Sequence, residues 1–344
     1  MKIAHIYYSL GFGGIETLIL NVSNWQVKNG HDVSIILVNE NYESDLISLL
    51  DERVKIIKLN RKPNTSPMFA VLKLNFTLIK SQFDILHIHA AELGRIILPV
   101  FNFSKVLHVH STVGITNTKV GHYRKCIAIS EVVRDVLASK YGVKSKVIYN
   151  GIDFRRFKQR KLTAVSNKII SVGSLNTEIK NQDGMIRQFA QIVNRVSSEL
   201  HIVGDGPDYE KLKTLIKELG LSERVFLLGN KSPRWLQENL CDYDLFLQAS
   251  HNEGLGIAAI EAAASCVPLL LSGADGHIEI SNNGERCQLF DPYLGDAMAE
   301  GIINFYENSD NYFNQAIEHY GSFKSKFDFE LYNEQLQSLY LSNY

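Results

Sequence analysis

The sequence has few of the features that mark secreted, membrane-spanning or metal-binding proteins. Cysteine occurs four times in 344 residues, without the spacing of a metal site or a disulfide framework. A reduced, cytoplasmic compartment is therefore expected. No apolar run approaches the roughly 20 residues needed to cross a bilayer, and residues 3–8 are too short a run for a signal peptide. If the protein meets a membrane, we expect it to bind from one side, at the inner face of the cell membrane.

Charge is unevenly distributed along the chain, although the formal net charge is only -1. Residues 1–163 carry 23 Lys and Arg against 12 Asp and Glu, whereas residues 164–344 carry 13 against 25. No acidic residue occurs between Glu52 and Asp84 or between Glu92 and Glu131. Such a basic first half fits either a solvated surface or a site for anionic lipid or a lipid-linked phosphate.

Short apolar runs alternate with helical patterns, which is the signature of βαβ units and a parallel sheet. A helix is expected from about Glu16 to Asn29, closed by Gly30. The strands expected in the first half lie at residues 3–8, 33–38, 85–89, 106–110, 127–129 and 146–149. Those expected in the second half lie at residues 169–172, 200–203, 225–228, 245–248, 268–271 and 288–290.

The length and the repeated pattern predict two domains. Residues 151–167 are polar and basic and are expected to link them. The domains are therefore expected at residues 1–163 and 164–322, with a C-terminal helical segment, residues 323–344, that crosses back onto the first domain. Two Rossmann-like domains facing each other across a deep cleft would bring both sets of strand carboxyl ends to one ligand site.

Two glutamates eight residues apart are the most informative pair in the chain. Glu253 precedes a turn with Gly254 and Gly256, and Glu261 follows in an alanine-rich helical pattern. The glycines permit close approach to the backbone, and a helix N-terminus offers N–H groups to an anion. Because carboxylates accept hydrogen bonds from hydroxyl groups and helical spacing lets both acids face one cleft, this segment fits a sugar nucleotide.

Ordered motifs along nearly the whole chain resemble those of the retaining glycosyltransferases of family 4, which have the GT-B fold. The motifs are Gly11-Phe12-Gly13-Gly14-Ile15-Glu16, Asn29-Gly30-His31-Asp32-Val33, Asp84-Ile85-Leu86-His87-Ile88-His89, Val109-His110-Ser111, Val147-Ile148-Tyr149-Asn150-Gly151-Ile152-Asp153, Val172-Gly173-Ser174-Leu175 with Lys180-Asn181, Val203-Gly204-Asp205-Gly206-Pro207 and the segment around the two glutamates. The resemblance implies an α/β protein that uses a nucleotide-sugar as co-substrate, with neither cofactor nor metal.

The resemblance also assigns roles in the second half. Glu253 would contact hydroxyls of the transferred sugar, Glu261 would bind the nucleotide ribose, and Lys180 would neutralise the departing diphosphate. Ser174 stands where the family usually has an arginine, so one side-chain cation is present where two are common. The pyrophosphate would be held by backbone N–H groups of the turn formed by Gly254, Leu255, Gly256 and Ile257.

In the first half, His110 resembles the family histidine placed against the reacting sugar. Gly13 and Gly14 resemble a loop that helps to place acceptor and phosphate, and they lack the third glycine of a dinucleotide fingerprint. Zinc is the competing interpretation for the two His-x-His pairs, but no cysteine or acid of ligand spacing accompanies them. The other three histidines of these pairs, His87, His89 and His108, are expected to pack.

Asp242-Tyr243-Asp244 has the spacing of a divalent-metal motif found in another glycosyltransferase fold. It precedes the apolar run of residues 245–247 and does not follow a buried strand, so we expect it to open a strand.

We therefore expect transfer of a sugar to a glycan or a lipid-pyrophosphate-linked acceptor, in bacterial surface polysaccharide biosynthesis. Phe69, Leu72, Phe76 and Ile79 recur at helical spacing beside lysines, as in an interfacial helix, although the pattern favours a helix that faces a core. The alternatives are an epimerase on the same fold and a non-catalytic binding protein. Nucleic acid is not expected as a partner because no RNA-binding motif is present.

Overall fold

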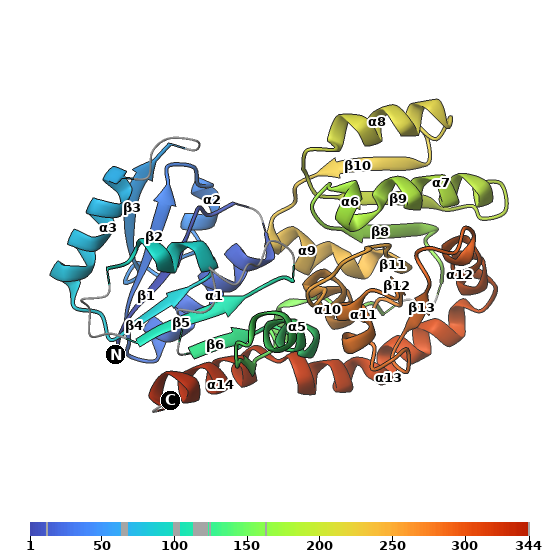
Figure 1. Ribbon diagram of the computed structural model, residues 1–344. Coiled ribbons are helices and arrows are strands. Elements are labelled where there is room, and N and C mark those ends of the chain that lie inside the picture. Colours follow the sequence, from blue (N-terminus) through green and yellow to red (C-terminus); the bar gives the residue numbers. More distant parts are fainter. Residues whose placement is uncertain are drawn as a thin grey trace. The chain divides into compact units, whose positions relative to one another are not determined.

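The computed structural model describes residues 1–11, 13–62, 68–98, 104–112, 123, 125–161 and 164–342. The chain divides into two compact units. The first comprises Met1–Gly151 and Glu330–Tyr344, and the second comprises Ile152–Phe329. Each unit contains one parallel sheet with helices around it (Figure 1). The prediction of an α/β protein made of two Rossmann-like domains is confirmed.

The sheet of the first unit has the strand order β3-β2-β1-β4-β5-β6-β7 within the described residues. Its strands are β1 (Lys2–Tyr7), β2 (Asp32–Asn39), β3 (Lys55–Arg61), β4 (Ile85–Ile88), β5 (Ser104–Val109), β6 (Lys125–Ala128) and β7 (Lys146–Val147). The helices are α1 (Gly14–Lys28), α2 (Ser44–Ile47), α3 (Met68–Ser81), η1 (Ala91–Ile96) and α5 (Glu131–Tyr141). Gly30 follows α1 with φ of +80°, the left-handed conformation that glycine favours at helix ends.

The strand β3 is absent from the sequence-based prediction. Its residues, Lys-Ile-Ile-Lys-Leu-Asn-Arg, alternate apolar and basic side chains, and the run was interpreted only as part of a basic stretch. An edge strand of a sheet is solvated along one side and tolerates such charges. In the structure β3 pairs in parallel with β2, so the basic residues lie at the edge of the first sheet.

The sheet of the second unit has the order β10-β9-β8-β11-β12-β13 (Figure 1). Its strands are β8 (Lys168–Val172), β9 (Glu199–Val203), β10 (Val225–Gly229), β11 (Leu245–Gln248), β12 (Leu269–Ser272) and β13 (Gln288–Phe290). The helices are η2 (Phe154–Arg156), α6 (Thr177–Lys180), α7 (Gln182–Ile192), α8 (Tyr209–Glu218), α9 (Pro233–Asn239), η3 (Leu240–Asp242), α10 (Ile257–Ala264), α11 (Asp275–Ile280), α12 (Ala297–Glu307) and α13 (Ser309–Phe327). All six strands predicted for this half are present.

The segment expected to be a linker differs from that expectation. Residues from Ile152 onward belong to the second unit, where Phe154 and Phe157 are buried. Arg160 is buried as well, and its guanidinium is paired with Asp244 at 2.7 Å. The basic residues of this segment are typical of a solvated linker. In the structure, however, the buried Asp244 carboxylate neutralises the charge of Arg160.

The C-terminal segment contains the end of α13 and the helix α14 (Phe329–Leu341). The chain rejoins the first unit at Glu330, later than the expected residue 323. Tyr332, Leu336 and Leu339 of α14 are buried, and the Lys125 ammonium of β6 donates to the backbone carbonyls of Leu339 and Ser342. None of the described helices has both the length and the apolar character to cross a membrane.

Candidate active site

In both sheets the chain adds strands on one side of the first strand and then crosses over to add strands on its other side. In the second unit this reversal falls between β8 and β11, which are hydrogen-bonded neighbours. Ligands of open α/β sheets bind where the loops after two such strands diverge. The loop after β8 leads to Lys180, and the loop after β11 leads to Glu253. The fold of this unit alone therefore brings both residues to one place.

Lys180 and Glu253 form a short ion pair in that place. The Lys180 ammonium donates to Oε2 of Glu253 at 2.6 Å, and the two side chains are 18% and 12% exposed. Backbone bonds set the pairing, because the N–H groups of His251 and Asn252 both donate to the carbonyl of Ile179. Burial raises the pKa of Glu253, but Lys180, His277 and hydrogen bonds outweigh burial and hold that pKa below its usual range.

Three polar neighbours of Glu253 were not identified from the sequence. Gln248 and Ser250 each donate a hydrogen bond to Oε2, at 3.2 and 3.3 Å. Nε2 of His277 in α11 lies 3.8 Å from the same oxygen and 3.2 Å from the side-chain amide oxygen of Gln248. A signal existed for Gln248, since a polar residue at the carboxyl end of a buried parallel strand often faces a ligand. The sequence holds no comparable signal for His277.

The glycine turn after Glu253 is tightly packed. Gly256 has φ of +92°, and a Cβ placed on it would lie 3.0 Å from the His277 ring. A Cβ on Gly276 would lie 2.7 Å from the backbone oxygen of Glu253. Leu255 and Gly254 are buried, and α10 begins directly afterwards at Ile257. The turn therefore enters α10 through a backbone that only glycine accommodates without strain, and the first N–H groups of a helix have no intrahelical partner.

Glu253 and Glu261 occupy different elements, which corrects the expectation of two acids on helical spacing. Glu253 lies in the loop before α10, and only Glu261 lies on the helix. Burial raises the pKa of Glu261 to about 7. No side chain of the described part of the protein forms a hydrogen bond or ion pair with its carboxylate. The two acids therefore differ in their charge state near neutral pH.

The remaining residues predicted for the site divide between the units. Ser174 follows β8 with an exposed side chain, and its carbonyl accepts a bond from Gln182 at 2.8 Å. Gly13 and Gly14 start α1 and are exposed, whereas Phe12 of the same motif lies outside the described residues. His110 directly follows β5 and is half-buried. The last three belong to the first unit.

The second acid of the Asp242-Tyr243-Asp244 motif has a structural role. Asp244 is fully buried, and its oxygens accept bonds from the Arg160 guanidinium, the Ser166 amide and hydroxyl and the Lys168 amide. It precedes β11, as the sequence predicts. Its side chain therefore holds the start of β8 against β11 and the segment before it.

Two protein-family models match the chain, one along most of each unit. The family described as Glycosyltransferase Family 4 matches residues 12–156, and the family described as Glycosyl transferases group 1 matches residues 153–321. N-acetyl-α-D-glucosaminyl L-malate synthase of Bacillus anthracis is 27% identical over 57% of this chain and 53% of that protein. An uncharacterized glycosyltransferase of Haemophilus influenzae is 26% identical over 83% of this chain and 86% of that protein.

A Campylobacter jejuni enzyme is 31% identical over 48% of this chain and 45% of its own length; it is named N-acetylgalactosamine-N,N'-diacetylbacillosaminyl-diphospho-undecaprenol 4-α-N-acetylgalactosaminyltransferase. This chain thus spans about half the length of two of these three relatives. The crystal structure of Anabaena Alr3699/HepE in complex with UDP and glucose has a TM-score of 0.83 at 20% identity, with 98% of both chains covered. By its motifs, family matches and fold, the chain belongs to the family 4 (group 1) glycosyltransferases with the GT-B fold.

Proposed function

We propose that this glycosyltransferase moves a sugar from a nucleotide-sugar to a saccharide or lipid-pyrophosphate-linked acceptor with retention of configuration, without a metal, in bacterial surface polysaccharide synthesis at the cytoplasmic face of the membrane. The observation that carries the proposal is the Lys180–Glu253 pair at the strand reversal, 2.6 Å apart and next to the N-terminus of α10. A cation beside free backbone N–H groups suits a diphosphate. Carboxylates beside it suit sugar and ribose hydroxyls.

The roles of the residues follow from charge. As the bond between the sugar and the diphosphate breaks, negative charge grows on the leaving phosphate oxygen, and the Lys180 ammonium and the N–H groups at the start of α10 stabilise it. The leaving oxygen accepts the proton of the attacking hydroxyl while the new glycosidic bond forms on the same face. Glu253 accepts hydrogen bonds from the sugar, and Glu261 accepts them from the ribose.

The first experiment identifies the donor and tests the pair together. Melting temperatures with UDP-, GDP-, ADP- and dTDP-sugars should show one stabilising class, because a ligand that binds only the folded state raises stability. Lys180→Met and Glu253→Gln should lower turnover of that donor by about 100-fold or more, and circular dichroism should show that both variants are folded at the temperature of the assay. Lys213→Ala, at a lysine that is 65% exposed on α8, is the control.

Unchanged turnover in Lys180→Met would contradict the site. Conversion of the sugar nucleotide to an isomer without any acceptor would favour the epimerase alternative.

An exposed apolar face of α3 supports membrane contact by the first unit. Phe69, Leu72, Phe76 and Ile79 are 77%, 63%, 67% and 59% exposed, while the core side of the helix is formed by its residues Ala70, Leu74, Asn75 and Leu78. The expectation that the four exposed apolar residues of α3 face a core is therefore wrong. Four large apolar side chains on one helix face exceed the scattered exposure that is ordinary in a monomer.

Charge favours an anionic lipid surface as the occupant of this α3 face. Lys73 and Lys80 lie on the same helix, and the neighbouring strand β3 carries Lys55, Lys58 and Arg61. The two elements pack against each other. Amphipathic helices flanked by lysines bind anionic bilayers through apolar burial and electrostatic attraction.

Vesicle sedimentation tests the lipid contact. Binding to phosphatidylglycerol vesicles should exceed binding to phosphatidylcholine vesicles and should weaken as salt rises. The double variant Phe69→Ser with Phe76→Ser should lose most binding, whereas Ile317→Ser, at a 56% exposed position on α13, should not. Equal binding to both lipids, or full binding by the double variant, would contradict the proposal.

A further inference from the structure

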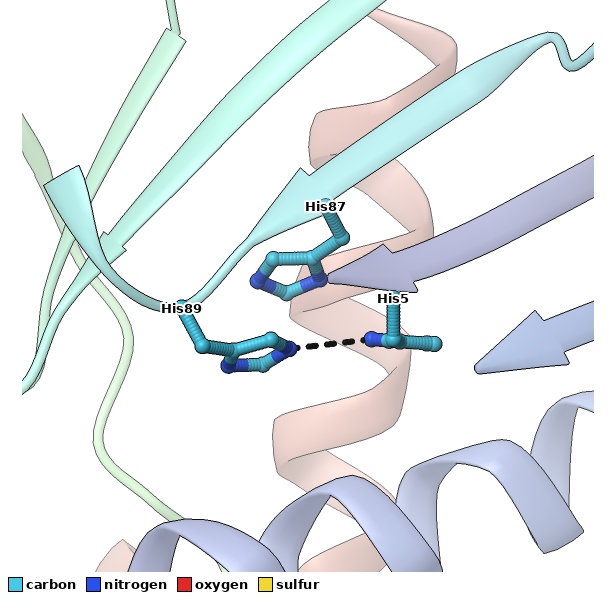
Figure 2. A group of neighbouring side chains, drawn as sticks. All are labelled: His5, His87 and His89. Atoms are coloured by element: carbon cyan, nitrogen blue, oxygen red, sulfur yellow. Dashed lines mark hydrogen bonds between the residues drawn. The ribbon is translucent and has the colours of Figure 1, made fainter. Parts of the chain in front are cut away.

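Five buried or half-buried histidines lie together in the first unit. His5 comes from β1, His87 from β4, and His108 from β5, while His89 and His110 follow the ends of β4 and β5. The rings form a stack in which His87 and His89 are 4.4 Å apart and His108 and His110 are 4.1 Å apart, between centroids. Figure 2 shows His87 beside His89, with the ring of His89 joined to that of His5 by a hydrogen bond.

One hydrogen-bonded chain runs from Gln26 of α1 to His110. The side-chain amide oxygen of Gln26 lies 2.9 Å from Nε2 of His5, and Nδ1 of His5 lies 3.0 Å from Nε2 of His89. Nδ1 of His89 then lies 3.2 Å from Nε2 of His110. Nδ1 of His110 is buried and has no hydrogen-bond partner in the described part of the chain. The chain therefore ends at the histidine that the family resemblance places against the sugar.

The direction of this chain follows from elementary chemistry. A neutral imidazole has one N–H and one lone pair, and burial lowers the pKa of His5 to about 4 and that of His110 to about 3. The Gln26 oxygen can only accept, so Nε2 of His5 carries the proton. Nδ1 of His5 must then accept from His89, and Nδ1 of His89 must accept from His110. The lone pair that remains is on Nδ1 of His110.

A second chain also begins at Gln26, but its hydrogen bonds are donated away from Gln26, whereas those of the first chain are donated toward it. A side-chain hydrogen bond from Gln26 opposes the rise that burial produces in the pKa of Tyr340. The Tyr340 hydroxyl lies 2.6 Å from Nδ1 of His87, and Nε2 of His87 lies 3.3 Å from Nδ1 of His108. When the Gln26 amide nitrogen donates to Tyr340, each later group donates to the next. Both chains thus depend on the orientation of one amide, which is only 2% exposed.

A metal ion is a less suitable occupant of this cluster. His5, His87 and His89, and likewise His89, His108 and His110, have nitrogens within 4.8 Å of one another. A metal needs a lone pair from every ligand, whereas in the hydrogen-bonded chain one nitrogen of each His5–His89 and His89–His110 contact carries a proton. Neither set includes a cysteine or a carboxylate to offset a divalent charge in a buried place.

We propose that Gln26, acting through His5 and His89, holds His110 in the tautomer whose Nδ1 has the free lone pair, so that His110 accepts a hydrogen bond from a sugar hydroxyl. The inference rests on the proposed function only for the identity of that hydroxyl. Gln26, His5 and His89 are positioning residues, because they reach the substrate through His110 alone. A buried acceptor without a partner is what a bound hydroxyl would satisfy.

Nitrogen-15 NMR of the full chain labelled at histidine tests the tautomer directly, since protonated and unprotonated ring nitrogens resonate in separate regions. His110→Asn assigns the His110 signals. The wild-type protein should show Nε2 protonated and Nδ1 unprotonated at His110, and the best donor should shift the Nδ1 signal. Gln26→Met should give a mixture of tautomers at His110 and lower kcat about tenfold with little change in the KM of the donor.

The control is Asn75→Ala, which removes a buried amide of the same unit that bonds Ile96 and Leu98 and does not touch the histidines. It should lower stability without altering the tautomers. Protonated Nδ1 at His110 in the wild type, an unchanged signal in Gln26→Met, or a tightly held zinc ion whose removal changes these signals would overturn the proposal. Absence of turnover with every donor would overturn the proposed function. The His110 tautomer of the free protein would still show whether Gln26 acts on His110 through His5 and His89.

Discussion

At the scale of single residues, the two acids of the site have opposite electrostatic environments. Glu253 has a cation at 2.6 Å and two neutral donors, so it is ionised well below neutral pH. Glu261 has burial without a charged partner, which raises its pKa to about 7. Folding therefore favours the protonated form of Glu261. The folded state loses stability as pH rises from about 4.5 to about 7, because the buried carboxyl group must then ionise.

Glu261→Gln should remove that cost. The folded pKa lies above the unfolded one, so the wild-type protein loses stability as pH rises through this window and the variant does not. The shift corresponds to at most about 3 kcal/mol above pH 7. Urea unfolding at pH 4.5 and pH 8 should show similar stability of the two proteins at the lower pH and a more stable variant at the higher pH. An equal difference at both pH values would contradict this assignment.

Gly256→Ala should destabilise the turn before α10. Its φ of +92° strains any residue with a side chain, and the added methyl would press on the His277 ring at 3.0 Å. We expect a loss of about 1–3 kcal/mol and weaker binding of the nucleotide. The matched control is Gly321→Ala in α13, where nothing lies within 4 Å of the new methyl and stability should rise by up to about 1 kcal/mol. Equal effects of both substitutions on unfolding would exclude the conformational cause.

At the scale of elements, a buried ion pair joins the segment after residue 151 to the second sheet. The Arg160 and Asp244 side chains are 4% and 0% exposed, and the guanidinium also stacks on Phe313 of α13 at 4.5 Å. A buried pair contributes little relative to apolar packing, but removing one partner leaves a buried charge without compensation. The segment therefore depends on this contact more than its polar sequence indicates.

Asp244→Ala should lower stability by about 3–5 kcal/mol, because it leaves the guanidinium buried and unpaired. Glu238→Ala is the control, since its partner Arg234 is 82% exposed and such surface pairs contribute less than about 1 kcal/mol. Urea unfolding followed by tryptophan fluorescence and by circular dichroism measures both. A comparable loss in the two variants would show that burial of the pair is unimportant.

The elements differ in how well local sequence predicts them. The buried strands of the second unit are continuous apolar runs and were predicted, because parallel strands covered on both faces have that composition. The strand β3 was not predicted because its edge position allows basic residues. For α3, spacing predicted a helix with one apolar face but not the side on which the core lies, since its Ala70, Leu74 and Leu78 form a second apolar face.

At the scale of the whole molecule, the sequence predicts those candidate site residues that lie within a single motif. Lys180, Glu253 and the glycine turn were identified because each has a local signal that a family motif repeats. Gln248 and His277 were not, because they reach Glu253 from the end of β11 and from α11. The chain from Gln26 to His110 joins α1 to β1 and to the residues that follow β4 and β5, and no local pattern of the sequence predicts these contacts.

The central claim is that a nucleoside diphosphate binds in the second unit where β8 and β11 diverge. A crystal structure of the full chain with the nucleoside diphosphate of its best donor tests it most directly. The account predicts the diphosphate against the Lys180 ammonium and the first N–H groups of α10, with the ribose at Glu261. A diphosphate bound at any other place, with Lys180 still paired to Glu253, would contradict it.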